Sequence, residues 1–254
     1  HALGVSESGR GDAMRNYLQR NIFFGDDAQL NPLSGAQFVL HGPKSDDVIG
    51  SIGVDTADIP ALHGQSIEIE GHTAFVARRK PHGNLHWTVI TEDESAAATI
   101  WDVLHTAGAT LAGAIAFNTL RIQAGVPAFG REITADYLPL EVGLWDEISF
   151  AKGCYTGQEI IARMESRSQL SRLMVRVSMR EAVPTPTDLF DLDGKAIGKL
   201  TSSVADGSGA HVGIAIVKQL FAGTGTTINT ETGQPITVRD IAGARPPEHM
   251  LKEI

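Results

Sequence analysis

The chain has 254 residues, of which 42% are hydrophobic and 20% charged, and its formal net charge is −9. This composition is typical of a soluble globular protein with room for two domains, and the negative charge argues against a general nucleic-acid-binding surface. The single cysteine excludes an internal disulfide and indicates a reducing compartment. No apolar run approaches the length of about 18 residues that a membrane span needs, so none is predicted.

The first two thirds of the chain are expected to alternate between helices and a group of strands. The expected elements are a helix over 9–20, a strand over 37–40, a helix from Gly42-Pro43, strands over 66–70, 73–78 and 85–91 with a turn at 81–84, and helices over 92–105 and 113–123. The last helix has a clear stop signal, since Gly125 and Pro127 follow it. Local antiparallel connections predict an α+β layer rather than a doubly wound sheet.

From Ser171 onward the pattern changes to short strands separated by glycine-rich turns. Strands are expected over 173–178, 196–203, 212–217 and 236–239, with no helix among them. This pattern predicts a small all-β domain, a barrel, over residues 171–254. The domain boundary is therefore placed near residue 170.

The only cysteine, Cys154, lies in the segment Lys152-Gly153-Cys154-Tyr155-Thr156-Gly157-Gln158-Glu159. Thr156 and Glu159 have the spacing of a capping box with Thr156 as N-cap, so a helix is expected to begin here. The helix N-terminus and the charge of Lys152 both favour the thiolate form of Cys154, which a reactive cysteine requires. The alternative is a small packing residue, because most lone cysteines are buried.

Two polar residues elsewhere are candidates for binding a flat heterocycle. Gln123 lies near a helix end and Glu141 follows a proline turn, so both could supply fixed polar groups among apolar walls. An ordinary helix end is the simpler interpretation. The nine histidines show no metal-ligand spacing, and no metal site is predicted.

The segment 152–159 together with Arg163 resembles the signature of the YgfZ family of folate-binding proteins. This family is related to the glycine-cleavage aminomethyltransferases, or T-proteins. The segments 121–127, with the pattern R-I-x-A-G-x-P, and 139–141, with the pattern P-x-E, are also similar in order and spacing. The resemblance covers the whole chain, and the family's first several dozen residues are expected to be missing, since the chain opens at His1 rather than at a methionine.

The resemblance implies an α+β fold of T-protein type. It would form a ring of a folate-binding α+β region within residues 1–170, a ferredoxin-like unit over about 41–110, and the C-terminal β-barrel over 171–254. It implies tetrahydrofolate, or a derivative, as the cofactor. It also implies a role in the assembly or repair of iron–sulfur cluster enzymes, including enzymes that thiolate tRNA.

The resemblance further implies partners, a location and a role for each site residue. The partners are iron–sulfur enzymes or cluster-assembly proteins, with no membrane, in the cytoplasm or, in a eukaryote, in the mitochondrial matrix. Cys154 is the working group, which Lys152 keeps ionised. The cofactor-binding residues are Gln123, Glu141, Tyr155 and Arg163, and the structural residues of the motif are Gly153, Thr156, Gly157, Gln158 and Glu159.

Several departures from the T-protein pattern keep a second function open. Over the stretch that corresponds to residues 152–159, T-proteins carry a pattern similar to K-x-D-F-I-G-x-E. Cys154 and Tyr155 stand here in place of the aspartate and the phenylalanine. Gln123 stands where T-proteins carry a pterin-binding glutamate. Their catalytic aspartate follows an Asn-Ala element, but Ser6-Glu7 stands there and Asp12 fits only with a one-residue shift. The alternative function is therefore a tetrahydrofolate-dependent aminomethyltransferase that uses Asp12.

A third hypothesis is an RNA-binding module. It would use a local basic cluster formed by Arg163, Arg167, Arg172 and Arg176. The acidic total favours solvated helix and strand faces over an RNA site, so direct nucleic-acid binding is not expected.

Overall fold

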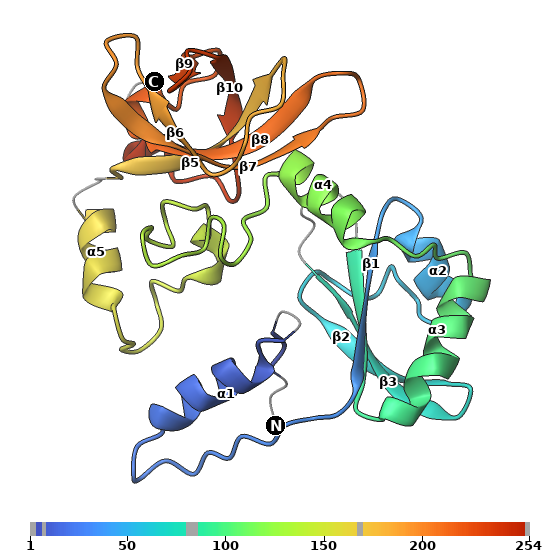
Figure 1. Ribbon diagram of the computed structural model, residues 1–254. Coiled ribbons are helices and arrows are strands. Elements are labelled where there is room, and N and C mark those ends of the chain that lie inside the picture. The colour runs from blue at the N-terminus through green and yellow to red at the C-terminus, as the bar shows by residue number, and fades with distance from the viewer. Residues whose placement is uncertain (1–3, 7–8, 80–85, 167–169, 252–254) are drawn as a thin grey trace. The chain divides into compact units, whose positions relative to one another are not determined.

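The computed structural model describes residues 4–6, 9–79, 86–166 and 170–251 (Figure 1). Glu7, Arg167 and the turn expected at 81–84 lie outside these residues. The described chain forms two compact units, which divide between Thr110 and Leu111. The boundary near residue 170, between a folate-binding region and a barrel domain, stays a prediction.

The first unit is built on a four-stranded antiparallel sheet of order β1-β4-β3-β2. Its elements are α1 (Gly11–Arg20), β1 (Ala36–His41), α2 (Ser45–Ser51), β2 (Gly64–Ile69), β3 (His72–Arg78), β4 (His86–Thr91), a 3-10 turn (Glu94–Ala96) and α3 (Ala97–Thr106). Strands β2 and β3 form a tight hairpin whose turn residues, Glu70 and Gly71, both have positive φ, as a primed turn requires.

Helices α2 and α3 cover one face of this sheet (Figure 1). Ile49 of α2 and Ile100 of α3 pack with Val76, Trp87 and Val89 into the buried core of the unit. The expected helix over 92–105 begins later, at Ala97, because residues 94–96 form a 3-10 turn. Helix α1 is formed as expected, but it buries no residue.

The second unit is built on a closed barrel of order β10-β5-β8-β7-β6-β9. Its elements are α4 (Ala114–Ala124), a 3-10 turn (Trp145–Glu147), α5 (Gln158–Ser166), β5 (Arg172–Met179), β6 (Thr187–Phe190), β7 (Ala196–Ala205), β8 (His211–Lys218), a 3-10 turn (Gln219–Phe221), β9 (Thr227–Thr230), β10 (Pro235–Ile241) and a 3-10 turn (Glu248–Met250). The predicted α+β class and the C-terminal barrel are therefore confirmed. Strands β6 and β9, of four residues each, were not predicted.

Strands β7 and β10 of the barrel carry bulges, and two of these re-aim polar side chains. In β7, Leu200 pairs with Ala215 and Ser202 with Ile214, so Thr201 is an extra residue in the ladder. In β10, the register shifts between Val238 and Asp240, and Arg239 is extra. Both bulges contribute to the polar sites described below.

The barrel also depends on close approaches between neighbouring strands, and that at Gly198 is the tighter of two between β7 and β8. A Cβ at Gly198 of β7 would lie 2.3 Å from the carbonyl oxygen of Ile216 in β8. Real Cβ atoms do not come this close to backbone, so the strands can pair here only around a glycine. The interior beside them is filled by buried side chains such as Val175, Leu189 and Ile228.

Candidate functional site

Cys154 is exposed and lies in the loop that leads into α5. The helix begins only at Gln158, since Gly157 has a φ of 87°, far from helical values. Gln158 Oε1 accepts a hydrogen bond from the Tyr155 N–H at 3.0 Å. In the part of the chain that the structure describes, the Thr156 hydroxyl makes no hydrogen bond, so the capping box assigned to Thr156 and Glu159 is wrong.

The structure brings Lys152 and Tyr155 together next to this cysteine. The Lys152 ammonium lies 4.8 Å from the centroid of the Tyr155 ring, a cation–π contact. Tyr155 is half-buried and packs against the barrel core with Ile148 and Met164. The ring therefore holds the lysine charge near the loop, and the effect of that charge on the thiol stays a prediction.

Gln123, in the last turn of α4, lines a pocket of about 250 Å³. The other lining residues are Ile122, Arg176, Asp206, Val212 and Arg239. Helix α4 ends there because Gly125 adopts the left-handed conformation, with a φ of 70°, as its position after the helix predicted. The pocket thus lies between a helix end and one side of the barrel.

Arg176 of β5 is fixed across this pocket by two sets of hydrogen bonds. Its Nη1 donates to the Gln123 carbonyl oxygen at 2.5 Å, and its Nε and Nη2 donate to Asp240 at 2.7 and 2.5 Å. The hydrogen bonds to Asp240 raise the pKa of Arg176, so the Arg176 guanidinium stays charged. Because Arg239 is the bulged residue of β10, Asp240 pairs directly across the ladder with Arg176.

Asp206 adds a carboxylate to the lining. The side chain and backbone N–H of Ser208 donate to Asp206 Oδ1 at 2.7 and 2.8 Å. These hydrogen bonds lower the pKa of Asp206 below its ordinary value. The pocket therefore combines an amide, two guanidinium groups and an ionised carboxylate with the apolar side chains of Ile122 and Val212.

A buried ion pair joins Arg121 of α4 to Glu132, in the loop that follows the helix. The Arg121 side chain is 7% exposed and that of Glu132 is 0% exposed, and Arg121 Nη1 lies 3.1 Å from Glu132 Oε2. Arg121 also donates to Asn118 Oδ1 at 2.8 Å and to the Val126 carbonyl at 3.2 Å. Glu132 Oε2 accepts from the Ala128 N–H at 3.0 Å. The pair therefore ties the end of α4 to the loop that follows it.

The barrel completes this network with two consecutive hydroxyl groups. Thr201 Oγ1 and Ser202 Oγ lie 2.5 and 2.7 Å from Glu132 Oε1, and Arg121 Nη2 donates to Ser202 Oγ at 2.8 Å. Consecutive residues of a regular strand face opposite sides, so the β7 bulge is what lets both hydroxyls reach one oxygen. Both ions are thus hydrogen-bonded as well as paired, as buried charges need to be.

The other three predicted cofactor-binding residues, Glu141, Tyr155 and Arg163, do not line the Gln123 pocket. Glu141 is 5% exposed, and its Oε2 accepts from the Leu138 N–H at 3.1 Å, which closes the turn between these residues. Its carbonyl accepts from Met174 N–H of β5 at 2.9 Å. Arg163 is exposed on α5. Their roles in cofactor binding stay predictions.

No pattern in the sequence indicated Glu132, Ser202 or Asp240 as site residues. Arg121 stands in the R-I-x-A-G-x-P segment, which was the one available signal for this network. The helices of the described residues are all too short or too polar to span a bilayer. Within the same ranges, no three His, Cys, Asp or Glu side chains are grouped so that they could hold a metal ion.

The fold is that of the T-protein aminomethyltransferases. The crystal structure of the glycine cleavage system aminomethyltransferase T from Bartonella henselae matches with a TM-score of 0.77 and 22% identity, over 94% of this chain and 66% of that chain. The model of the GCVT N-terminal domain matches residues 1–152. The chain therefore belongs to the family of the GCVT N-terminal domain.

The chain is also similar in sequence to several named proteins. A chloroplastic protein of Arabidopsis thaliana that bears the name of a transferase is 31% identical over 215 residues, or 83% of this chain and 49% of the relative. The aminomethyltransferase of Lysinibacillus sphaericus is 27% identical over 77% of this chain and 55% of the relative. That of Moorella thermoacetica is 29% identical over 88% and 63%. The chain thus spans about half to three fifths of the length of these relatives.

Proposed function

We propose that the chain binds tetrahydrofolate, or a derivative of it, at the Gln123 pocket. The observation that carries this proposal is that Gln123 shares the pocket with two guanidinium groups, those of Arg176 and Arg239. Sites for small molecules combine a few fixed polar groups with apolar walls, which Ile122 and Val212 supply here. Gln123 also stands where the T-protein pattern carries its pterin-binding glutamate.

The residues present fit this ligand. A pterin ring edge both donates and accepts hydrogen bonds, and the Gln123 side-chain amide can do the same. Arg239 is exposed and, among the described residues, forms no ion pair, which leaves a guanidinium for an anionic group. At about 250 Å³ the pocket is smaller than the roughly 300–1,000 Å³ of typical small-molecule sites, so it would hold one part of the cofactor.

A titration with tetrahydrofolate under anaerobic conditions tests this proposal. Gln123→Ala removes one or two hydrogen bonds of about 1 kcal/mol each, so the affinity should fall about tenfold. Gln123→Glu should bind more tightly than Gln123→Ala, because a carboxylate can accept charge-assisted hydrogen bonds. Gln65→Ala is the control, since Gln65 is exposed on β2. Equal affinities for the wild type and Gln123→Ala would contradict the assignment.

We further propose that the folate-bound protein supports the assembly or repair of iron–sulfur enzymes, including tRNA-thiolating ones, through Cys154. The support is that this thiol is exposed and free, within a segment that resembles the YgfZ signature. An exposed thiol can be approached by a partner protein or a cluster, which a buried one cannot. Complementation of a deletion strain tests the role. Full rescue of an iron–sulfur enzyme by both Cys154→Ala and Cys154→Ser would rule it out.

The second candidate is a folate-dependent aminomethyltransferase, which the names of the bacterial relatives favour. Asp12 would be its reacting carboxylate. It is exposed on α1, and its Oδ1 lies 3.4 Å from Arg15 Nη2. Turnover of an aminomethyl-carrying lipoyl protein, lost in Asp12→Asn, would establish this activity. Absence of turnover by a protein that binds tetrahydrofolate would leave the accessory role as the better account.

A further inference from the structure

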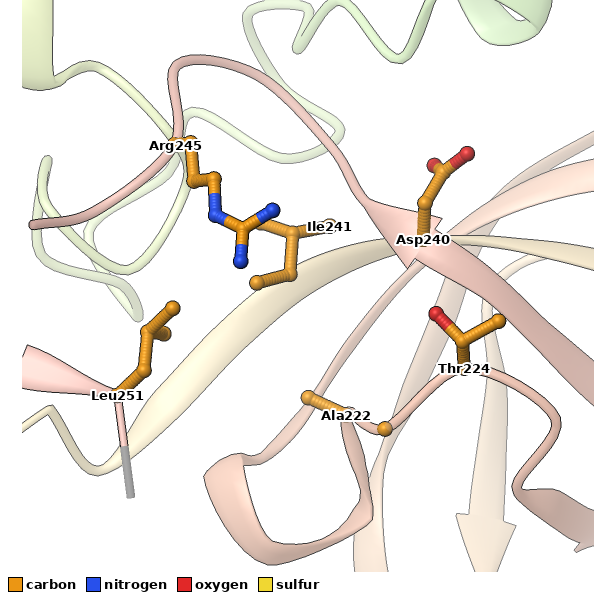
Figure 2. A pocket seen from close by; sticks show the side chains of 7 residues that line it. Ala222, Thr224, Asp240, Ile241, Arg245 and Leu251 are labelled. Atoms are coloured by element: carbon orange, nitrogen blue, oxygen red, sulfur yellow. The ribbon is translucent and has the colours of Figure 1, made fainter. Parts of the chain in front are cut away.

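We propose that a second pocket, at one end of the barrel, binds a small carboxylic acid with an apolar body. This pocket measures about 310 Å³ and is separate from the one that Gln123 lines. Its lining residues are Ala222, Gly223, Thr224, Asp240, Ile241, Arg245 and Leu251 (Figure 2). They come from the segment before β9, the end of β10 and the chain that follows it.

The charge in this pocket belongs to Arg245. The Asp240 carboxylate also lines the pocket, but Arg176 neutralises it through hydrogen bonds of 2.7 and 2.5 Å. Figure 2 shows this carboxylate pointing away from the Arg245 guanidinium, which lies toward Ile241 and Leu251. Over the described ranges, Arg245 forms no ion pair and no side-chain hydrogen bond, although the chain carries a net charge of −9. Its guanidinium is therefore available to an anion.

The floor of the pocket is apolar. Ala222 is 2% exposed and belongs to the barrel core, and the half-buried side chains of Ile241 and Leu251 pack against that core. The Thr224 hydroxyl is exposed and, among the residues described, has no hydrogen-bond partner. The Arg245 guanidinium therefore lies beside the apolar side chains of Ile241 and Leu251, while Thr224 lies across the pocket next to Ala222 (Figure 2). A ligand placed here would meet a cation and apolar atoms together.

This combination selects the chemical class of the ligand. The planar guanidinium presents two parallel N–H groups that match the two oxygens of a carboxylate. A bare phosphate would gain nothing from the apolar floor, whereas a short branched chain or a single ring would bury apolar surface there. A volume at the lower end of small-molecule sites limits the body to that size.

Calorimetric titration of the full chain with 4-methylpentanoate tests the proposal. Wild type should bind it, and Arg245→Gln should bind it about tenfold or more weakly, because a charge-assisted pair is lost. Arg131→Gln is the matched control, since Arg131 is exposed in the same unit and does not line the pocket. Leu251→Ala should also weaken binding, through the lost apolar contact.

Three comparisons decide the outcome. The uncharged 4-methylpentanamide should bind more weakly than the acid, and so should inorganic phosphate. Gln123→Ala should bind the acid as the wild type does, so this test does not depend on the folate proposal. Equal binding by the wild type and Arg245→Gln, phosphate binding as tight as that of the acid, or no binding of the acid would each overturn the inference. Circular dichroism of Arg245→Gln confirms that a loss of affinity does not come from unfolding.

Discussion

Replacing Glu132 with alanine tests whether the buried network holds the loop after α4 against the barrel. The two Glu132 oxygens accept hydrogen bonds from Arg121 Nη1, the Ala128 N–H, Thr201 Oγ1 and Ser202 Oγ. Alanine removes all of these acceptors at a side chain that is 0% exposed. It also leaves the Arg121 guanidinium, 7% exposed, as a buried charge without its partner.

The expected loss in the free energy of unfolding follows from the hydrogen bonds that each donor retains in Glu132→Ala. Thr201 Oγ1 lies 2.9 Å from the Ile214 carbonyl, and Arg121 keeps the oxygens of Asn118 and Val126, so part of the hydrogen bonding survives. The uncompensated charge remains, and breaking a buried ion pair by removing one partner costs about 3–5 kcal/mol. Replacing both ions, with Arg121→Met and Glu132→Leu together, should recover most of this loss, because no charge is then left buried.

Urea unfolding followed by hydrogen exchange of peptides from β7 and β8 measures this cost in the second unit alone. With a urea dependence of about 2 kcal/mol/M, a loss of 3–5 kcal/mol lowers the midpoint by about 2 M. A loss below about 1 kcal/mol for Glu132→Ala would refute the reasoning. So would a double variant that is less stable than Glu132→Ala.

Substitutions at Ser208, Gly198 and Gly50, and the reactivity of Cys154, give further predictions. Ser208→Ala should raise the pKa of Asp206 toward its ordinary 3.8, which carboxyl NMR titration measures. In the wild type, the hydrogen bonds from Ser208 to ionised Asp206 stabilise the folded state above pH 3.8. That stabilisation is lost as the pH falls through the lowered folded-state pKa of Asp206. Gly198→Ala should destabilise the barrel by about 1–3 kcal/mol in urea unfolding, since the new Cβ would meet backbone. Gly50→Ala, in open space on α2, should instead stabilise the first unit by about 0.4–1 kcal/mol. Cys154 should react fully with a thiol reagent in the native protein, and slow reaction that speeds up on unfolding would contradict its exposure.

The elements that could be predicted from sequence are those whose signals lie within the element itself. Helix α4 was expected over 113–123 and spans Ala114–Ala124, because Gly125 ends it locally. Strands β6 and β9 were missed because neither sequence alternates between apolar and polar residues: TDLF has two adjacent apolar residues and TINT has one.

The same distinction applies to the candidate site. Cys154 was recognisable because its signature occupies consecutive residues. The helix start beside it was misplaced because Gly157 adopts a positive φ, and a spacing rule for side chains does not report backbone conformation. Glu132 could not be found, since its partner Thr201 lies 69 residues away and reaches it only through a bulge.

The extra residue Thr201 in β7 is needed for the Glu132 carboxylate, 69 residues earlier in the chain, to keep all its hydrogen-bond donors. If Thr201 were deleted, the ladder from Leu200 to Ser202 would become regular, and only one hydroxyl could face the Glu132 carboxylate. One oxygen would lose a donor in a site closed to water, which disfavours keeping a charge there. Across the family, relatives without this insertion should therefore carry an uncharged residue in place of Glu132, whatever reaction they perform. Co-variation of the residue inserted at Thr201 with a charge at position 132 would then reflect a requirement of folding rather than of catalysis.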